Sequence, residues 1–249
     1  MSQTILAVCG KGGVGKTTIS ALIARHLAHR NRPALLVDAD PAGGLAMALH
    51  FTPAKTINDA RRQTVHDIRQ GTIDKRDLAV SLDYLVQALL IERGNLAFLP
   101  IGRPEEKGCY CSVNRLLKDS IALLADRFDT IVIDAEAGIE QINRDVMQRV
   151  TYLLLVSDTS AKGLKVVRTI RDVAAQMGTV AEAGLVINRV RTDEEARAAA
   201  ANTSLPVLGF LPEDETVRRF DAEEGNFFEM PATEAAHQLE ALINPVFST

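Results

Sequence analysis

A glycine-rich segment near the start of the chain carries the residue types that bind phosphate. The run from Gly10 to Thr17, GKGGVGKT, matches G-x-x-x-x-G-K-[ST] and lies between an apolar run and a helical pattern. Its backbone N–H groups and the following helix N-terminus suit phosphate oxygens, Lys16 suits the β and γ phosphates, and the Thr17 hydroxyl suits Mg²⁺. We therefore expect ATP or ADP to bind here, and ATP to be hydrolysed with Mg²⁺. The expected nucleotide ligands in this segment are Gly12, Gly13, Val14, Gly15, Lys16, Thr17 and Thr18.

A second lysine, Lys11, lies inside the loop, where it cannot easily serve the same phosphates as Lys16. One interpretation is that Lys11 reaches the nucleotide of a second subunit and supplies positive charge in trans, as an arginine finger does. The alternative is an ordinary solvated lysine. The residue type and position alone favour neither interpretation.

Three aspartates follow apolar runs that are typical of buried strands. Asp38 and Asp40 end the segment LLVDAD, and Asp134 ends IVID. Ligands of an open parallel sheet lie beyond the carboxyl ends of its strands, so these carboxylates should converge on the loop. We assign Asp134 to Mg²⁺, directly or through water, Asp38 to a magnesium-bound water, and Asp40 to orienting or activating the attacking water. The alternative for each is a helix cap or a turn residue.

The elements that must position these residues alternate between short apolar runs and longer helical patterns. Strands are expected at 4–9, 33–38, 95–101, 130–134, 152–157, 183–188 and 206–211. Helices are expected at 16–30, 113–127, 164–177, 196–201, 214–224 and 232–243, and the region 56–93 has a mostly helical pattern. This alternation predicts one α/β domain over residues 1–249, with a mainly parallel sheet and helices on both of its faces.

Composition narrows the class of protein. Apolar residues make up 47% of the 249 residues and charged residues 24%, which is ordinary globular usage. The net charge of -4 argues against binding to nucleic acid, which needs clustered Lys and Arg. No apolar stretch approaches the ~20 residues that span a bilayer, so no membrane partner is expected. Three cysteines make no disulfide framework, and we expect a cytoplasmic protein.

At this point the sequence resembles a known family, the deviant Walker A P-loop ATPases, over about residues 1–215. The loop KGGVGKT and the segments VDADP and VIDAEAG carry the resemblance. It implies that Lys11 acts across a homodimer that sandwiches nucleotide between its subunits. It also implies that the Asn188 amide recognises adenine, with Arg189 beside it, and that the loop containing Pro212 packs on the base.

Two cysteines narrow the resemblance further. Cys109-Tyr110-Cys111 precedes a helical pattern, and with Glu136 and the segment 157–164 it is similar to the CooC-type ATPases. These assist nickel insertion into carbon monoxide dehydrogenase, and a C-x-C pair from each subunit forms a metal site at the dimer interface. Thiolates bind soft or borderline metals, so the chemistry allows Zn²⁺, Ni²⁺ or an iron–sulfur cluster. The alternative is two structural thiols.

Three functions follow from these patterns. The first is a dimerising ATPase that carries nickel or zinc to a client metalloenzyme, with carbon monoxide dehydrogenase as the expected client. The second is a positioning or partition ATPase of the MinD and ParA kind, which needs a basic DNA-binding face or an amphipathic membrane anchor. The third is an iron–sulfur carrier that uses the Cys109 and Cys111 pairs.

Overall fold

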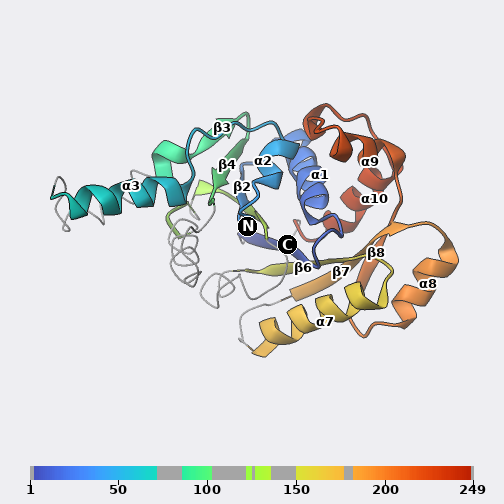
Figure 1. Ribbon diagram of the computed structural model, residues 1–249. Coiled ribbons are helices and arrows are strands. Elements are labelled where there is room, and N and C mark those ends of the chain that lie inside the picture. The colour runs from blue at the N-terminus through green and yellow to red at the C-terminus, as the bar shows by residue number, and fades with distance from the viewer. Residues whose placement is uncertain are drawn as a thin grey trace.

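The protein, seen in a computed structural model, is described for residues 3–71, 86–102, 122–124, 127–135, 150–176 and 182–247. Within these ranges the strands form one eight-stranded sheet in the order β3-β4-β2-β5-β1-β6-β7-β8 (Figure 1). Their bounds are β1 (Thr4–Gly10), β2 (Ala34–Asp38), β3 (Ile91–Arg93), β4 (Leu96–Pro100), β5 (Thr130–Asp134), β6 (Tyr152–Ser157), β7 (Glu182–Val190) and β8 (Val207–Pro212). All pairings are parallel except that of β3 with β4.

Helices cover both faces of this sheet. The described ones are α1 (Lys16–His29), α2 (Gly44–Ala48), α3 (Ile57–Arg69), α7 (Ala161–Gln176), α8 (Asp193–Ala201), α9 (Glu215–Ala222), the short η4 (Phe227–Glu229) and α10 (Glu234–Ile243). In Figure 1, α1, α2, α9 and α10 lie on one side of the sheet and α7 and α8 on the other, whereas α3 projects away from the body.

The central strand shows why the chain folds in this way. Every residue of β1 is buried, and successive side chains alternate between two cores. Leu6 and Val8 pack with apolar residues of α1 and α10, whereas Ile5 and Ala7 pack with those of α7. A strand with apolar residues on both faces needs cover on both faces, which is the α/β arrangement that the near-continuous apolar runs predict. The predicted fold class is therefore confirmed.

Most predicted elements appear within a few residues of their expected bounds. Three differ: β3 replaces helix at the end of the region 56–93, α2 was not predicted, and the expected helix 113–127 lies largely outside the described residues. The strand Ile91–Arg93 was mistaken for helix because it is short, at the sheet edge and only partly buried. Such an edge strand carries little of the apolar alternation that distinguishes a strand from a helix.

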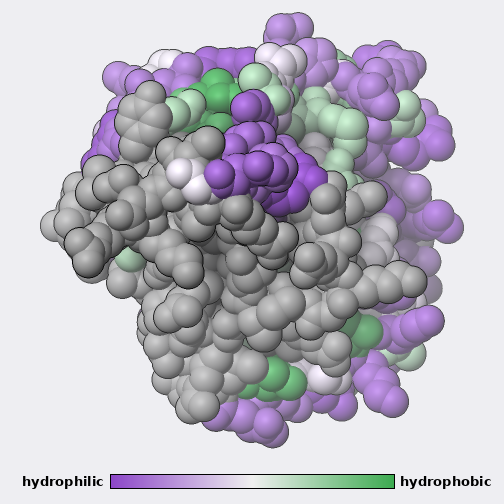
Figure 2. Space-filling model, turned by 60° about the vertical axis from the view of Figure 1, so that its left-hand side comes forward, coloured by the Kyte–Doolittle hydropathy of each residue, from purple (hydrophilic) through white to green (hydrophobic). Residues whose placement is uncertain are grey.

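The described surface is mixed in polarity. In Figure 2, most of the residues that carry a hydropathy colour are hydrophilic, with a few hydrophobic ones scattered among them. Met47 and Leu123 are the large hydrophobic side chains exposed in the described part of the chain. Among the helices that the structure describes, none is long and apolar enough to cross a membrane.

Candidate nucleotide-binding site

The loop after β1 turns with glycines where the backbone requires them. Gly13 and Gly15 adopt positive φ angles of 82° and 94°, which L-residues with a side chain rarely adopt. A Cβ atom at Gly10 would lie 2.2 Å from the Val156 carbonyl oxygen on the neighbouring β6. The loop then enters α1 directly at Lys16, and no side chain caps this end of the helix, so the N–H groups of the first helical turn remain available to a ligand of the loop.

Asp134 lies beneath this loop and is fully buried. The Thr17 hydroxyl donates to its Oδ2 at 2.8 Å, and the Ser20 hydroxyl donates to its Oδ1 at 2.9 Å. Burial raises the pKa of Asp134 to about 6, while these two hydrogen bonds and the Lys16 charge oppose the rise. Lys16 is itself only 7% exposed. The arrangement places one carboxylate, one hydroxyl and one cation where a magnesium-bound phosphate would lie.

Asp38 is the neighbour of Asp134 across the β2–β5 pairing and is also buried. Its two carboxylate oxygens accept from backbone N–H groups, Oδ1 from Asp40 at 3.2 Å and Oδ2 from Ala46 at 3.1 Å. Burial, and then the charge of Asp134, raise the pKa of Asp38 to about 7. Asp38 therefore also holds the β2–α2 loop in place, a structural role that the prediction of a magnesium-bound water did not include.

Asp40 lies at the turn of that loop, and its carboxylate accepts from the Ala42 N–H at 2.8 Å. Asp38 and Asp40 both border a cavity of about 300 Å³ that reaches Thr56 and Gly102. A Cβ atom at Gly44 would lie 3.3 Å from the Thr17 side chain, so the loop approaches Thr17 closely. The three predicted carboxylates thus do gather around the start of α1.

The end of β7 contacts the phosphate loop from the other side. The buried Asn188 amide donates to the Val14 carbonyl at 2.9 Å, and the Arg189 guanidinium donates to the Gly13 carbonyl at 3.1 Å. A Cβ atom at Gly15 would lie 2.5 Å from the Asn188 amide nitrogen. Both residues were predicted as nucleotide ligands, and both contact the loop itself.

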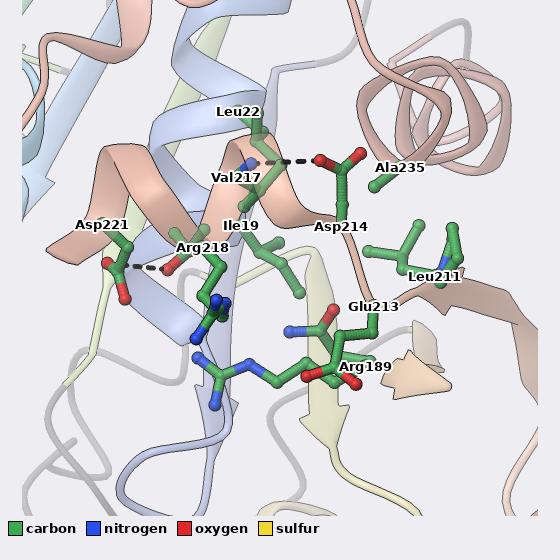
Figure 3. A pocket seen from close by; sticks show the side chains of 13 residues that line it. Ile19, Leu22, Arg189, Leu211, Glu213, Asp214, Val217, Arg218, Asp221 and Ala235 are labelled. Atoms are coloured by element: carbon green, nitrogen blue, oxygen red, sulfur yellow. Dashed lines mark hydrogen bonds between the residues drawn. The ribbon is translucent and has the colours of Figure 1, made fainter. Parts of the chain in front are cut away.

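Beside Asn188 and Arg189 lies a cavity of about 170 Å³ (Figure 3). Its walls come from α1, the ends of β7 and β8, the β8–α9 loop, α9 and the start of α10. The lining residues are Thr18, Ile19, Leu22, Asn188, Arg189, Leu211, Pro212, Glu213, Asp214, Val217, Arg218, Asp221 and Ala235. Asp214 caps α9 by accepting from Thr216 and Val217. The cavity combines an apolar part, from Ile19, Leu22 and Val217 among others, with several polar and charged side chains, a mixture that suits a small molecule with both kinds of group.

Two residues at the site were missed by sequence reasoning. Ser20 lies one turn after Lys16 on α1, and that spacing is a signal that could have placed it on the same helix face, where it donates to Asp134. Asp221 on α9 accepts from the Thr18 hydroxyl at 3.3 Å, a contact across 203 residues that no local pattern reveals. Lys11 lies half-buried on the loop.

The predicted metal-binding cysteines, Cys109 and Cys111, lie outside the described residues, as does Glu136. Within the ranges that the structure does describe, no three His, Cys, Asp or Glu side chains group as metal ligands would. Mg²⁺ does not need such a group, since it keeps several waters and takes one or two carboxylates with the substrate phosphates. The oxygen donors of Thr17, Asp38 and Asp134 fit that requirement.

Comparison with known proteins places this geometry in a family. Residues 5–227 match the CobQ/CobB/MinD/ParA nucleotide-binding domain. The chain belongs to that family. An uncharacterized ATP-binding protein of Methanocaldococcus jannaschii is 31% identical over 254 residues, with 98% of this chain and all of that protein covered. The carbon monoxide dehydrogenase accessory protein CooC of Rhodospirillum rubrum is 25% identical over 265 residues, covering 96% of this chain and 95% of CooC.

Solved structures agree with this assignment. The cell division ATPase MinD of Pyrococcus furiosus is 26% identical, covers 99% of this chain and all of its own, and superposes with a TM-score of 0.73. MinD of Pyrococcus horikoshii, complexed with Mg-ADP, has the same fold with a TM-score of 0.72 at 23% identity, over 99% of this chain and 96% of its own. As a member of the CobQ/CobB/MinD/ParA family, the chain is therefore classed with the ATP-binding P-loop ATPases.

Proposed function

We propose that this protein hydrolyses Mg-ATP in a dimer-forming cycle that delivers nickel to a client metalloenzyme, with carbon monoxide dehydrogenase as the expected client. One observation carries the ATPase part: the buried Asp134 carboxylate accepts from Thr17 directly beneath the phosphate loop. The similarity to CooC over 96% of the chain and the Cys109-Tyr110-Cys111 motif support the delivery part.

Each site residue has a role in this proposal. Lys16 and the loop N–H groups bind the β and γ phosphates. Thr17, Asp134 and Asp38 hold Mg²⁺ directly or through water, and this ion offsets charge on the transferring phosphoryl group when bound. Asp40 orients the attacking water, because its carboxylate lies in the loop that wraps Thr17.

The remaining parts of the proposed nucleotide site are the adenine-binding residues and the second subunit of the dimer. Asn188 and the loop containing Pro212 hold adenine in the cavity beside α9, which their lining position supports. Lys11 extends to the nucleotide of the second subunit. The dimer brings two Cys109 and Cys111 pairs together, so that four thiolates hold nickel or zinc as cargo. We further propose that residues 1–249 form one such domain in the cytoplasm.

Metal analysis of the dimer tests the delivery part. Wild type and a Cys109→Ser/Cys111→Ser variant are loaded anaerobically with Ni²⁺ or Zn²⁺, gel-filtered with ATP, with ADP and without nucleotide, and measured for metal and mass. We expect one metal ion per wild-type dimer and none in the variant, with equal affinity for ATP. Unchanged stoichiometric metal in the double variant contradicts the proposal.

The main alternative is a positioning ATPase, which the 26% identity and full-length superposition with MinD favour. Co-sedimentation with anionic liposomes and with DNA, each with and without ATP, separates the functions. ATP-dependent pelleting with wild-type strength in the cysteine variant favours positioning, and an anaerobic preparation with iron–sulfur absorption favours a cluster carrier.

A further inference from the structure

The end of β7 departs from regular strand geometry at two residues. The pairing of β7 with β8 is interrupted between Ile187 and Val190, so Asn188 and Arg189 are not paired with β8. Arg189 also has a φ angle of 60°, in the left-handed region that a residue with a long side chain seldom occupies. Irregular strand ends of this kind turn side chains towards functional sites, and such strained residues gather there.

Both side chains are turned towards the phosphate loop. The Asn188 amide donates to the Val14 carbonyl and the Arg189 guanidinium to the Gly13 carbonyl, at 2.9 and 3.1 Å. These acceptors belong to two consecutive peptide groups of the loop. Arg189 is exposed, so its backbone strain is not compensated by burial of its side chain. The contact with the loop is the interaction that this conformation provides.

The geometry of the peptide group gives these bonds a consequence. In a planar trans peptide the C=O and N–H bonds point in opposite directions, and the described chain has no cis peptide bond. When Arg189 holds the Gly13 carbonyl on the β7 side, the Val14 N–H points away from β7. When Asn188 holds the Val14 carbonyl, the Gly15 N–H does the same.

We propose that Arg189 is a positioning residue, which orients the loop N–H donors for phosphate before nucleotide arrives, and does not itself bind the base. This role of Arg189 rests on one part of the proposed function, namely that the loop binds the phosphates. The end of β7, which borders the cavity proposed for adenine, would then also determine the geometry of the phosphate site. We call the hydrogen bond from Arg189 to the Gly13 carbonyl the clamp. Preformed donors stabilise negative charge without a reorganisation cost, so the clamp raises the affinity for phosphate and leaves the affinity for the base unchanged.

Binding of two ligands with Mg²⁺ present tests this assignment. ADP reaches the loop and the base cavity, whereas adenosine reaches the cavity alone, so the ratio of their affinities isolates the loop. We expect Arg189→Ala to lower the ADP-to-adenosine ratio about tenfold, the contribution of one hydrogen bond from a charged donor. Arg189→Lys should restore part of this ratio, because its ammonium keeps a charge and a donor.

Two further variants separate the clamp from the fold. Arg189→Gly relieves the strain of a φ of 60° but lacks the guanidinium. We therefore expect its melting temperature to be no lower than that of wild type, and its ADP-to-adenosine affinity ratio to be as low as that of Arg189→Ala. Arg191→Ala removes the same charge two residues away, from an exposed side chain paired with Glu213 at 2.7 Å, and should leave the ratio unchanged.

Order parameters of the Val14 and Gly15 amides give a readout that needs no nucleotide. In the nucleotide-free protein they should fall in Arg189→Ala and stay at the wild-type value in Arg191→Ala. Equal losses of ADP and adenosine affinity would make Arg189 a direct base ligand and overturn the proposal, as would an unchanged ratio in Arg189→Ala. A wild type that binds ADP but carries no nickel and hydrolyses no ATP would overturn the proposed function and leave the clamp standing.

Discussion

The buried carboxyl of Asp38 should make the nucleotide-free protein less stable as the pH rises. Its pKa is about 7 in the folded chain, against an ordinary value of 3.8, because burial and the neighbouring Asp134 disfavour its charge. A raised folded-state pKa means that the folded protein binds the proton more tightly than the unfolded chain. The stabilisation is full below pH 3.8 and is lost as the pH rises to 7.

The size of this effect follows from the same values. The whole interval from 3.8 to about 7 corresponds to at most about 4 kcal/mol, and the part lost between pH 5 and 8 to about 3 kcal/mol. Asp38→Asn removes the titrating group. Its amide also turns an N–H towards one of the two backbone donors, Asp40 N or Ala46 N, which costs about 1–3 kcal/mol at every pH. The variant should therefore be less stable than wild type at pH 5 and as stable or more so at pH 8.

Urea denaturation of the nucleotide-free protein, in chelator at pH 5, 6, 7 and 8, measures this crossover. The quantity of interest is the difference in unfolding free energy between variant and wild type, which should change by about 3 kcal/mol across the series. Asp172→Asn removes a carboxylate from the exposed side of α7 and serves as the matched control. Parallel stability curves for wild type and Asp38→Asn would refute the reasoning.

Other substitutions test separate parts of the site. Thr17→Ala removes the hydroxyl that donates to Asp134, and should lower the Mg²⁺-dependent ATPase rate about a hundredfold in a phosphate-release assay while ADP still binds. Gly15→Ala places a Cβ atom 2.5 Å from the Asn188 amide at a φ of 94°, and should lower the unfolding free energy by about 2 kcal/mol or more in urea. Lys11→Ala should keep ADP affinity and lose ATP-dependent dimerisation by light scattering; a dimer of normal strength would contradict its action in trans.

Sequence patterns sufficed where one segment determines the geometry. The apolar runs before Asp38 and Asp134 identify two buried strands, and the direction of a parallel sheet then brings both carboxylates to the edge that holds the loop. Gly13 and Gly15 likewise indicate a tight turn, since only a residue without a side chain adopts their φ angles readily.

Patterns failed where the geometry depends on register or on distant segments. That Asp38 lies directly opposite Asp134 follows from the pairing of β2 with β5, and this pairing places the charge of Asp134 where it adds to the effect of burial on the pKa of Asp38. The contact of Thr18 with Asp221 joins α1 to α9 across 203 residues. Short elements such as α2 carry too few residues for a periodic signal, so neither composition nor spacing reveals them.

The position of β1 in the sheet explains why such different contacts meet at one loop. β1 lies between β5 and β6, with β7 one strand further on, so the loop that leaves it has neighbours on both sides. On the β5 side, Asp134 holds Thr17 and Ser20 and therefore the start of α1. On the β7 side, hydrogen bonds from Asn188 and Arg189 hold the carbonyl groups of the loop. A loop held in this way has few conformations of its own, because Asn188 and Arg189 fix two of its carbonyl groups and Asp134 fixes the start of the helix that follows it.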